Sequence, residues 1–333
     1  MSKFKAFRIS ETADRKIEAA YTDFTLDELD PGAVVVKVAY STINYKDALA
    51  GTGKGRILRR ASCIGGIDLS GTVESSEDAR FKPGDRVLAT GHDLGVSHHG
   101  GYAEYARVPA DWLVKLPGTM NLKEAMAFGT AGFTAGLGIV RMEQVGLKPA
   151  NGPVIVSGAT GGVGSISVDS LAGLGYHVVA LTGKAEEEGY LKRIGAKEIM
   201  LRKDLDLAKI KPLDRATWAG AVDNLGGDVL AWMTSTMQIG GAIAAIGLAA
   251  SHELKTTVMP FILRGVSLLG IDSVNCPMPQ RLDVWRRLAG DMKPVHLGEM
   301  IRVVKFDDLP AAFPAFIEGK IRGRTVVEVG GGS

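Results

Sequence analysis

A glycine-rich turn places the strongest constraint on what this chain can fold into. The turn directly follows the apolar run Val154–Ser157 and reads Gly158-Ala159-Thr160-Gly161-Gly162-Val163-Gly164. A buried strand that enters such a turn and then a helix lets the backbone approach a pyrophosphate, because the helix N-terminus also supplies amide donors. The spacing departs from the usual G-x-G-x-x-G motif, whose third small residue would be Ser167 when counted from Gly162. We predict a dinucleotide site rather than a merely structural turn, with contacts at Thr160, Gly161, Gly162 and Val163.

The segments around this turn alternate between strand and helix patterns. Strands are predicted over Val154–Ser157, His177–Leu181, Lys197–Leu201, Ala219–Asp223, Ala242–Ile246 and Val266–Ile271. Helices are predicted between them, over Val163–Gly173, Glu186–Ile194 and Asp228–Met237. Alternation at this spacing indicates βαβ units and therefore a parallel sheet.

The rest of the chain has a pattern of short strands instead. Short strands separated by turns are predicted over Phe4–Ile9, Val34–Tyr40, Leu69–Glu74, Arg86–Ala89 and Tyr102–Val108, and again over Ile301–Lys305 and Thr325–Val329. Asn121 and Glu124 have the spacing of a helix N-cap with an acidic third residue, which predicts a helix from Ala125 to about Val145. The fold class is therefore α/β, with a β-rich domain over 1–124 and 298–329, a doubly wound domain over 125–297 and a flexible tail at 330–333.

The end of the second predicted strand of the parallel sheet indicates which dinucleotide binds. An acidic residue about 20 residues after the glycines usually holds the ribose 2′-hydroxyl of NAD. Thr182, Gly183 and Lys184 stand there instead, and Arg202 follows the next strand. A hydroxyl and two cations suit a 2′-phosphate, which favours NADPH. Because ligands bind at the carboxyl ends of such strands, Leu248, Ile271 and Ser273 are further candidate contacts, and Arg322 is expected to reach the cofactor from the β-rich domain.

Charge and cysteine content exclude several classes of function. The net charge of +2 leaves no basic footprint for nucleic acid. Cys63 and Cys276 are the only cysteines, which excludes a disulfide scaffold. One disulfide between the two stays open, but the low number suits a reducing compartment. The start of the chain lacks an apolar signal core, and no uninterrupted apolar stretch reaches the length of a membrane span. We expect a cytoplasmic protein without nucleic-acid or membrane partners.

Three motifs are distinctive: the glycine turn, the segment Phe81–Val87 and the segment Gly100–Tyr105. Together they resemble the medium-chain dehydrogenase/reductase superfamily over nearly the whole chain. The zinc-free, quinone-oxidoreductase-like branch is the most similar. Tyr40–Ala50, Thr257–Val266 and Leu269–Ser273 look in particular like the acrylyl-CoA reductase family, which uses NADPH to reduce acryloyl-CoA to propanoyl-CoA. The resemblance implies a co-chaperonin-like β-barrel domain, a Rossmann domain, a site in the cleft between them and a homodimer formed along the Val266–Ile271 strand.

The segment Asn44-Tyr45-Lys46-Asp47 stands where zinc-dependent relatives would carry a zinc-binding cysteine. Cys63 has no Cys or His partner at ligand spacing, so we expect no metal site. Without zinc, the expected reaction is conjugate reduction, which needs a proton at the α-carbon and stabilisation of the forming enolate. Tyr45 is the candidate proton donor, with water as the alternative. Asn44 is expected to orient the nicotinamide ribose or the substrate carbonyl.

A cluster of cations follows this motif within seven residues, at Lys54, Arg56, Arg59 and Arg60. Arginine forks suit phosphates, so the cluster is a candidate site for the CoA tail. A solvated charged turn is the equally simple alternative. Two other functions stay open for the whole chain: a quinone or enone reductase of the same fold, and a protein that binds NADPH without turnover.

Overall fold

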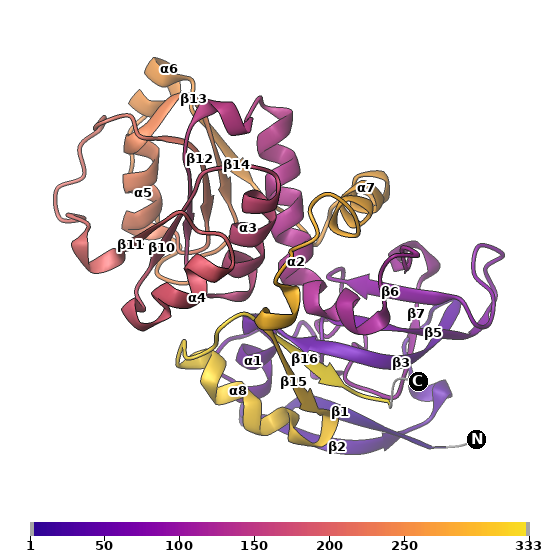
Figure 1. Ribbon diagram of the computed structural model, residues 1–333. Helices are drawn as coiled ribbons and strands as arrows, with labels where there is room; N and C mark the ends of the chain where they lie inside the picture. Colours follow the sequence, from indigo (N-terminus) through magenta and orange to yellow (C-terminus); the bar gives the residue numbers. More distant parts are fainter. Residues whose placement is uncertain (1–2, 331–333) are drawn as a thin grey trace. The chain divides into compact units, whose positions relative to one another are not determined.

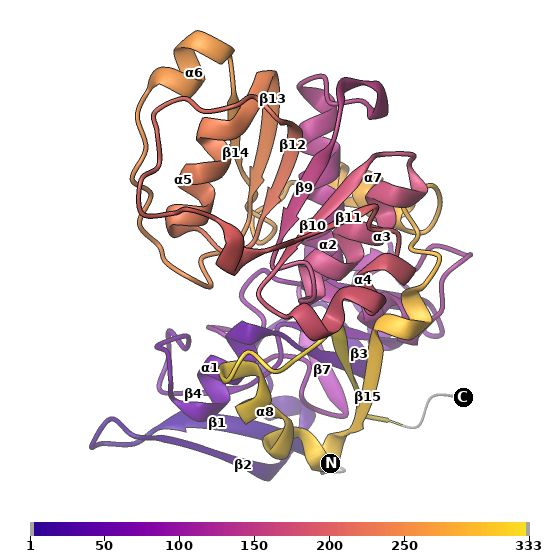
Figure 2. The ribbon, with the colours of Figure 1, turned by 60° about the vertical axis from the view of Figure 1, so that its left-hand side comes forward.

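The computed structural model describes residues 3–330, and the chain divides into two compact units (Figures 1 and 2). Unit 1 is formed by Met1–Thr130, Val274–Met278 and Ile301–Ser333, and unit 2 by Ala131–Ser273 and Pro279–Met300. Residues 331–333 of the expected tail lie outside the described residues. The amide of Gly330 donates a hydrogen bond to the carbonyl of Ala39, 3.3 Å away.

Unit 2 contains a six-stranded parallel sheet in the order β11-β10-β9-β12-β13-β14. Its strands are β9 (Val154–Ser157), β10 (Val178–Thr182), β11 (Glu198–Leu201), β12 (Trp218–Asp223), β13 (Met237–Ala245) and β14 (Ser267–Gly270). All residues of β9, β10 and β12 are buried, as expected for parallel strands covered on both faces. The strand order reverses between β9 and β12. The predicted parallel sheet is confirmed.

Helices cover both faces of this sheet. They are α3 (Gly162–Gly173), α4 (Glu188–Arg193), α5 (Gly227–Thr236) and α6 (Met259–Arg264). In Figures 1 and 2, α3 and α4 lie on one face and α5 on the other. Val229, Leu230 and Met233 of α5 belong to the same buried cluster as Ile155 and Ile243 of the sheet. The helix predicted over Glu186–Ile194 is shorter, because its first residues form a 3-10 turn.

The strands of unit 1 form two sheets of seven and three strands. The larger has the order β15-β16-β3-β5-β6-β8, with β7 also paired to β3, and the smaller has the order β2-β1-β4. The strands are β1 (Phe4–Glu11), β2 (Ile17–Phe24), β3 (Val34–Ile43), β4 (Ser62–Ile64), β5 (Asp68–Ser76), β6 (Arg86–Thr90), β7 (Tyr105–Val108), β8 (Val114–Lys115), β15 (Ile301–Lys305) and β16 (Arg324–Glu328). The expected strand Tyr102–Val108 begins only at Tyr105. The buried phenol of Tyr102 instead donates to the carbonyl of Thr42 at 2.8 Å.

Two helices of unit 1 and one that begins there lie outside the sequence prediction. They are α1 (Tyr45–Thr52), α8 (Leu309–Ile317) and α7 (Met278–Leu288). A Cβ at Gly51 would lie 2.4 Å from the ring of Phe313, so α1 and α8 pack closely enough to require glycine there. Short 3-10 turns lie at Leu26–Glu28, Ala110–Trp112, Pro149–Asn151, Ala185–Glu187, Arg202–Asp204, Leu297–Met300 and Phe306–Asp308.

Helix α2 (Leu122–Gln144) begins with the predicted capping box. The Glu124 amide donates to Asn121 Oδ1 at 2.8 Å, and the Asn121 amide donates to Glu124 Oε2 at 3.0 Å. The helix is kinked at Gly129, where φ is 50° and ψ is −155°. By length and composition α2 could cross a membrane, but 89% of its most apolar window is buried, which is typical of a core helix.

Candidate active site

The glycine turn of unit 2 is tightly closed and leaves no room for a side chain at Gly164. Gly158 has a φ of +57°, and its carbonyl accepts a hydrogen bond from the Gly161 amide at 3.0 Å. A Cβ at Gly164 would lie 2.2 Å from that carbonyl oxygen, which is backbone and cannot move aside cheaply. The turn leads directly into the twelve-residue helix α3. The backbone amides at the N-terminus of such a helix lack partners within the helix and can bind an anion. The candidate contacts Thr160, Gly161, Gly162 and Val163 all lie here.

The carboxyl ends of β10 and β11 bring four predicted residues together. Thr182 pairs in register with Leu201, so Arg202 follows immediately beside it. The Lys184 amide donates to Thr182 Oγ1 at 3.0 Å. A Cβ at Gly183 would lie 3.7 Å from an Arg202 guanidinium nitrogen, which places that cation beside the glycine. The structure therefore groups Thr182, Gly183, Lys184 and Arg202 at one sheet edge.

The remaining predicted contacts of unit 2 follow the last two strands. Leu248 lies just after β13 and is exposed, and the amide of Ile271 donates to the carbonyl of Ala245 at 3.1 Å. The carbonyl of Ser273 accepts a hydrogen bond from Arg281 at 2.9 Å. All three residues therefore lie at the carboxyl edge of the parallel sheet, as predicted from their position. Arg322 is exposed and precedes β16 in unit 1.

A polar group that the sequence analysis missed lies where the strand order reverses. Ser157 Oγ donates to the buried Asp223 carboxylate at 2.7 Å, and Asn224 Nδ2 donates to the carbonyl of Ser157 at 2.7 Å. Burial raises the pKa of Asp223. The ends of β9 and β12 are thus tied together at the switch point where such sheets bind ligands. The polar pair Asp223-Asn224 at the end of the buried strand β12 was the signal in the sequence that could have predicted this group.

In unit 1, Asn44 is the N-cap of α1 and the centre of a buried hydrogen-bond network. Its backbone amide donates to Asp47 Oδ2 at 2.8 Å. Its side-chain amide donates to Thr42 Oγ1 at 2.9 Å and to Asp68 Oδ2 at 2.8 Å. Its side-chain oxygen accepts a hydrogen bond from Arg324 Nη1 at 3.2 Å. Both ends of the Asn44 amide are therefore engaged by the protein.

Asp68 begins β5 and holds this network together. Besides Asn44, its carboxylate accepts hydrogen bonds from Thr42 Oγ1 at 2.5 Å and from the Thr130 amide at 2.9 Å. Asp47 is also buried, and burial followed by the charge of Asp68 raises its pKa to about 7. Asp47 accepts a hydrogen bond from the amide of Ile67 at 3.0 Å.

Arg324 supplies the positive charge of the network and was not singled out from the sequence. It is buried, and its Nε donates to the carbonyl of Ala127 at 3.1 Å. Burial lowers its pKa, while Asp68 and Asp47 oppose that effect. Its Nη2 is buried and has no hydrogen-bond partner among residues 3–330. An arginine far along the chain cannot be assigned to this cluster without the pairing of β16 with β3.

Tyr45 is the first residue of α1 and is the exposed member of the predicted catalytic pair. Its side chain is 51% exposed, and its hydroxyl has no hydrogen-bond partner within the described part of the chain. Asn44 beside it is nearly inaccessible. The network therefore fixes the start of α1 and leaves the Tyr45 phenol available to a ligand.

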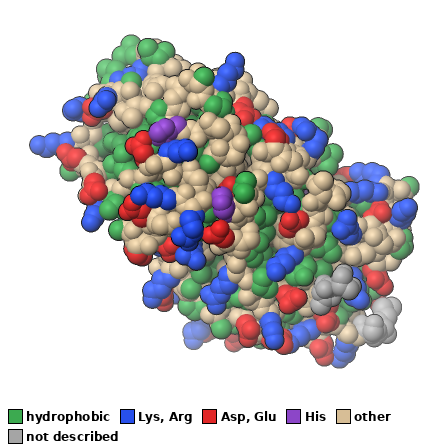
Figure 3. Space-filling model, in the orientation of Figure 1, with side chains coloured by type: hydrophobic (Ala, Val, Ile, Leu, Met, Phe, Trp, Pro, Cys, Tyr) green, Lys and Arg blue, Asp and Glu red, His purple; other side chains and the backbone are tan. Residues whose placement is uncertain are grey.

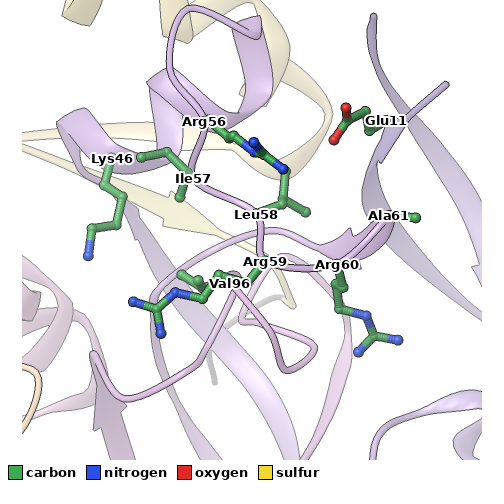
Figure 4. Close-up of a pocket in the computed structure, with 9 residues that line it drawn as sticks. All are labelled: Glu11, Lys46, Arg56, Ile57, Leu58, Arg59, Arg60, Ala61 and Val96. Atoms are coloured by element: carbon green, nitrogen blue, oxygen red, sulfur yellow. The ribbon is translucent and has the colours of Figure 1, made fainter. Parts of the chain in front are cut away.

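The predicted cationic cluster is divided by the structure. Arg56, Arg59 and Arg60 line a cavity of about 680 Å³, and Lys54 lies in the same loop but outside that lining (Figure 4). Arg60 is paired with Asp30 at 2.7 Å. Within residues 3–330, no group of three His, Cys, Asp or Glu side chains is placed to hold a metal ion.

Comparisons with known proteins place this geometry in a family. Residues 30–118 match the alcohol dehydrogenase GroES-like domain, and residues 162–288 match the zinc-binding dehydrogenase family. These matches confirm the expected co-chaperonin-like and Rossmann folds. Acrylyl-CoA reductase AcuI of Ruegeria pomeroyi is 46% identical over 94% of this chain and 95% of its own length.

Two further relatives match over almost their full lengths. Bacillus subtilis YhfP, which carries a provisional name as a quinone oxidoreductase, is 49% identical over 98% of this chain and 99% of its own. Its crystal structure with NAD bound superposes with a TM-score of 0.96. The yhdH oxidoreductase of Salmonella enterica in complex with NADP is 44% identical, covers 98% of this chain and all of its own, and has a TM-score of 0.95. The chain therefore belongs to the medium-chain dehydrogenase/reductase superfamily, among its quinone-oxidoreductase-like and acrylyl-CoA reductase members.

Proposed function

We propose that this oxidoreductase uses NADPH to reduce the 2,3 double bond of a short enoyl-CoA, with acryloyl-CoA converted to propanoyl-CoA. The observation that carries the proposal is the 46% identity to acrylyl-CoA reductase AcuI over 94% of the chain. The geometry of unit 1 agrees with it. The Tyr45 phenol is exposed and can donate a proton without a metal, and its neighbour Asn44 is held by a buried network of charged groups.

The residues of unit 2 fit a phosphorylated dinucleotide. The amides at the start of α3 would hold the pyrophosphate. The lack of room for a side chain at Gly164, beside the Gly158 carbonyl, supports this role. Lys184 and Arg202 would hold the 2′-phosphate. Leu248, Ile271 and Ser273 would contact the rest of the cofactor. When bound, NADPH supplies the hydride for the β-carbon.

Unit 1 supplies what the substrate needs besides the hydride. The α-carbon must gain a proton, and negative charge grows on the thioester oxygen during the reaction. Tyr45 is the group placed to donate a proton or a hydrogen bond there. Asn44 caps α1 and acts mainly by holding Tyr45 in place, since both ends of its amide are already engaged. The proposed reaction uses no zinc, and the family resemblance supports this, because it puts Asn44 and its neighbours where zinc-dependent relatives carry a zinc-binding cysteine.

A quinone or enone reductase is the second candidate, and the 49% identity to YhfP favours it. The deciding experiment measures NADPH and NADH oxidation with acryloyl-CoA, longer enoyl-CoA esters and a set of quinones. We expect the highest kcat/KM with acryloyl-CoA and NADPH. Turnover of quinones with none of any enoyl-CoA would refute the acyl-CoA proposal, and NADPH binding without turnover of any substrate would favour a non-enzymatic role.

We further propose a cytoplasmic homodimer without nucleic-acid partners. Cys63 and Cys276 are buried and form no disulfide with each other, which suits a reducing compartment. Lys and Arg side chains are interspersed with Asp and Glu on the face shown in Figure 3, without the one-sided charge that nucleic acid requires. β14 is an edge strand of the parallel sheet, and a second copy could pair along it.

A further inference from the structure

Two adjoining cavities in unit 1 are lined by an excess of positive side chains. The larger has a volume of about 680 Å³, and its charged lining consists of Lys46, Arg56, Arg59, Arg60 and Glu11. The smaller has a volume of about 420 Å³, shares Glu11 and Arg56 with the first, and adds Arg15. Five cations thus stand against one carboxylate, whereas the whole chain has a net charge of only +2. A cavity with this imbalance attracts a polyanion.

Arg60 is already paired within the protein and is not available to bind such a ligand. Its Nη1 donates to both carboxylate oxygens of Asp30, at 2.8 and 2.7 Å, and to the carbonyl of Ser97 at 3.3 Å. The pairing holds the pKa of Asp30 below its usual range, with burial opposing the shift. Arg60 therefore fixes the loop that carries the other cations.

Lys46, Arg56 and Arg59 remain available. Within residues 3–330, no carboxylate lies within ion-pair distance of Lys46 or Arg56. Arg59 stands 3.8 Å from Asp93, and both side chains are solvent-exposed, so this pair is weak. In Figure 4, Lys46 and Arg59 extend toward one side of the view, whereas Arg56 and Arg60 extend toward the other.

The cavity begins one residue away from the candidate catalytic tyrosine. Lys46 follows Tyr45 on α1, so their Cα atoms are about 3.8 Å apart. A substrate with its reacting carbonyl at Tyr45 can therefore extend a long arm past Lys46 into the cavity. Ile57, Leu58 and Val96 give the lining an apolar part that suits the uncharged portion of such an arm.

We infer that this cavity binds the nucleotide phosphates of the CoA substrate through Lys46, Arg56 and Arg59. The inference rests on the proposed function, and it refines the cationic cluster in two ways. It leaves out Lys54, which lines neither cavity, and it gives Arg60 a supporting role. Guanidinium groups bind phosphate oxygens with two parallel hydrogen bonds, which explains arginine at two of the three positions.

The test compares acryloyl-CoA with acryloyl-pantetheine, which keeps the thioester and its arm but lacks every phosphate. The readout is kcat/KM for acryloyl-CoA divided by kcat/KM for acryloyl-pantetheine. Arg56→Ala and Arg59→Ala should each lower this ratio about tenfold, the value of a charge-assisted hydrogen bond. Lys54→Ala is the matched control, since it removes a cation from the same loop, and it should leave the ratio within about twofold. Both arginines are exposed, and melting temperatures will verify folding.

The outcomes separate this inference from the proposed function. If acryloyl-CoA is reduced but the ratio is unaffected in Arg56→Ala and Arg59→Ala, the cavity is not the phosphate site and the proposed function stands. If neither thioester is reduced, the proposed function fails, and calorimetry with adenosine 3′,5′-bisphosphate decides the inference. Binding that is lost in Arg56→Ala would still support a nucleotide-phosphate site, and absence of binding to the unaltered chain would overturn it.

Discussion

The proposed function assigns the choice of dinucleotide to individual side chains at the ends of β10 and β11. Lys184 and Arg202 stand beside Gly183, and no carboxylate takes the place that would hold a ribose 2′-hydroxyl. Lys184→Ala should therefore lower kcat/KM for NADPH about tenfold more than kcat/KM for NADH, because only NADPH carries the 2′-phosphate. Steady-state kinetics with both cofactors measure the difference. Lys192→Ala, an exposed cation on the neighbouring helix α4, is the control, and equal losses for both cofactors would refute the assignment.

Tyr45 is the second residue whose chemistry can be isolated by a single substitution. Tyr45→Phe removes only the hydroxyl, and as the proton donor it should lower kcat about a hundredfold, the lower limit for general acid catalysis. Tyr40→Phe, in β3 of the same unit, is the matched control and should retain full turnover. Full turnover in Tyr45→Phe would assign the proton to water instead.

The buried Asp47 predicts a pH dependence of stability. Burial and the neighbouring Asp68 raise its pKa from 3.8 to about 7, so the folded chain holds this proton more tightly than the unfolded chain. Between about pH 4 and pH 7 this group therefore contributes less stability as the pH rises. The free energy of unfolding, measured in urea across this range for the unaltered chain and Asp47→Asn, isolates the effect. As the pH rises, the free energy of unfolding of the unaltered chain should fall relative to that of Asp47→Asn. A difference that stays constant with pH would contradict this.

The sequence predicted some of these residues and not others, for a physical reason. Thr182, Lys184 and the glycine turn follow strands with strong local patterns, so their place at the sheet edge could be anticipated. Asp68 and Arg324 are separated by 256 positions and meet only because β16 pairs with β3 and β3 with β5. Local patterns carry no information about such pairings.

At the scale of elements, Gly129 joins the two parts of α2 and touches the buried network. A Cβ there would lie 2.6 Å from Asp68 Oδ2 and 2.8 Å from Arg324 Nη2, and the φ of 50° disfavours any other residue. Gly129→Ala should therefore cost at least about 2 kcal/mol of stability. Gly173→Ala, at the end of α3 where a Cβ meets nothing within 4 Å, should be neutral or slightly stabilising. Urea unfolding compares the two, and equal stabilities would contradict the steric argument.

Elements with a strong period were predicted well, and irregular ones were not. β9 was predicted to its observed bounds, and the Asn121–Glu124 capping box marked the start of α2. Helix α8 escaped notice because Pro314 stands inside it, and α1 because its first residues were read only as a motif. The kink at Gly129 has no signature in the periodicity, since the apolar pattern continues across it.

At the scale of the whole molecule, an apolar surface lies on α6, the helix that leads into the edge strand β14. Val258, Ile262 and Leu263, in and just before α6, are exposed and precede β14 by a few residues, with Ile262 71% exposed. In Figure 3, hydrophobic side chains gather at the upper left, where Figure 1 places α6. A second copy that paired along β14 would cover apolar surface that is costly to leave in water.

The proposed homodimer can be tested without reference to catalysis. The unaltered chain should sediment at about 70 kDa, twice its mass of 35.2 kDa. Replacing Ile262 and Leu263 together by Glu should give a monomer, because two charges would be buried without partners at the interface. Val295→Glu is the matched control, since Val295 is 78% exposed in the same unit but distant in sequence from α6 and β14, and it should remain dimeric. An unaltered chain that sediments as a monomer at micromolar concentration would contradict the dimer, and a dimer that survives the paired substitution would place the interface elsewhere.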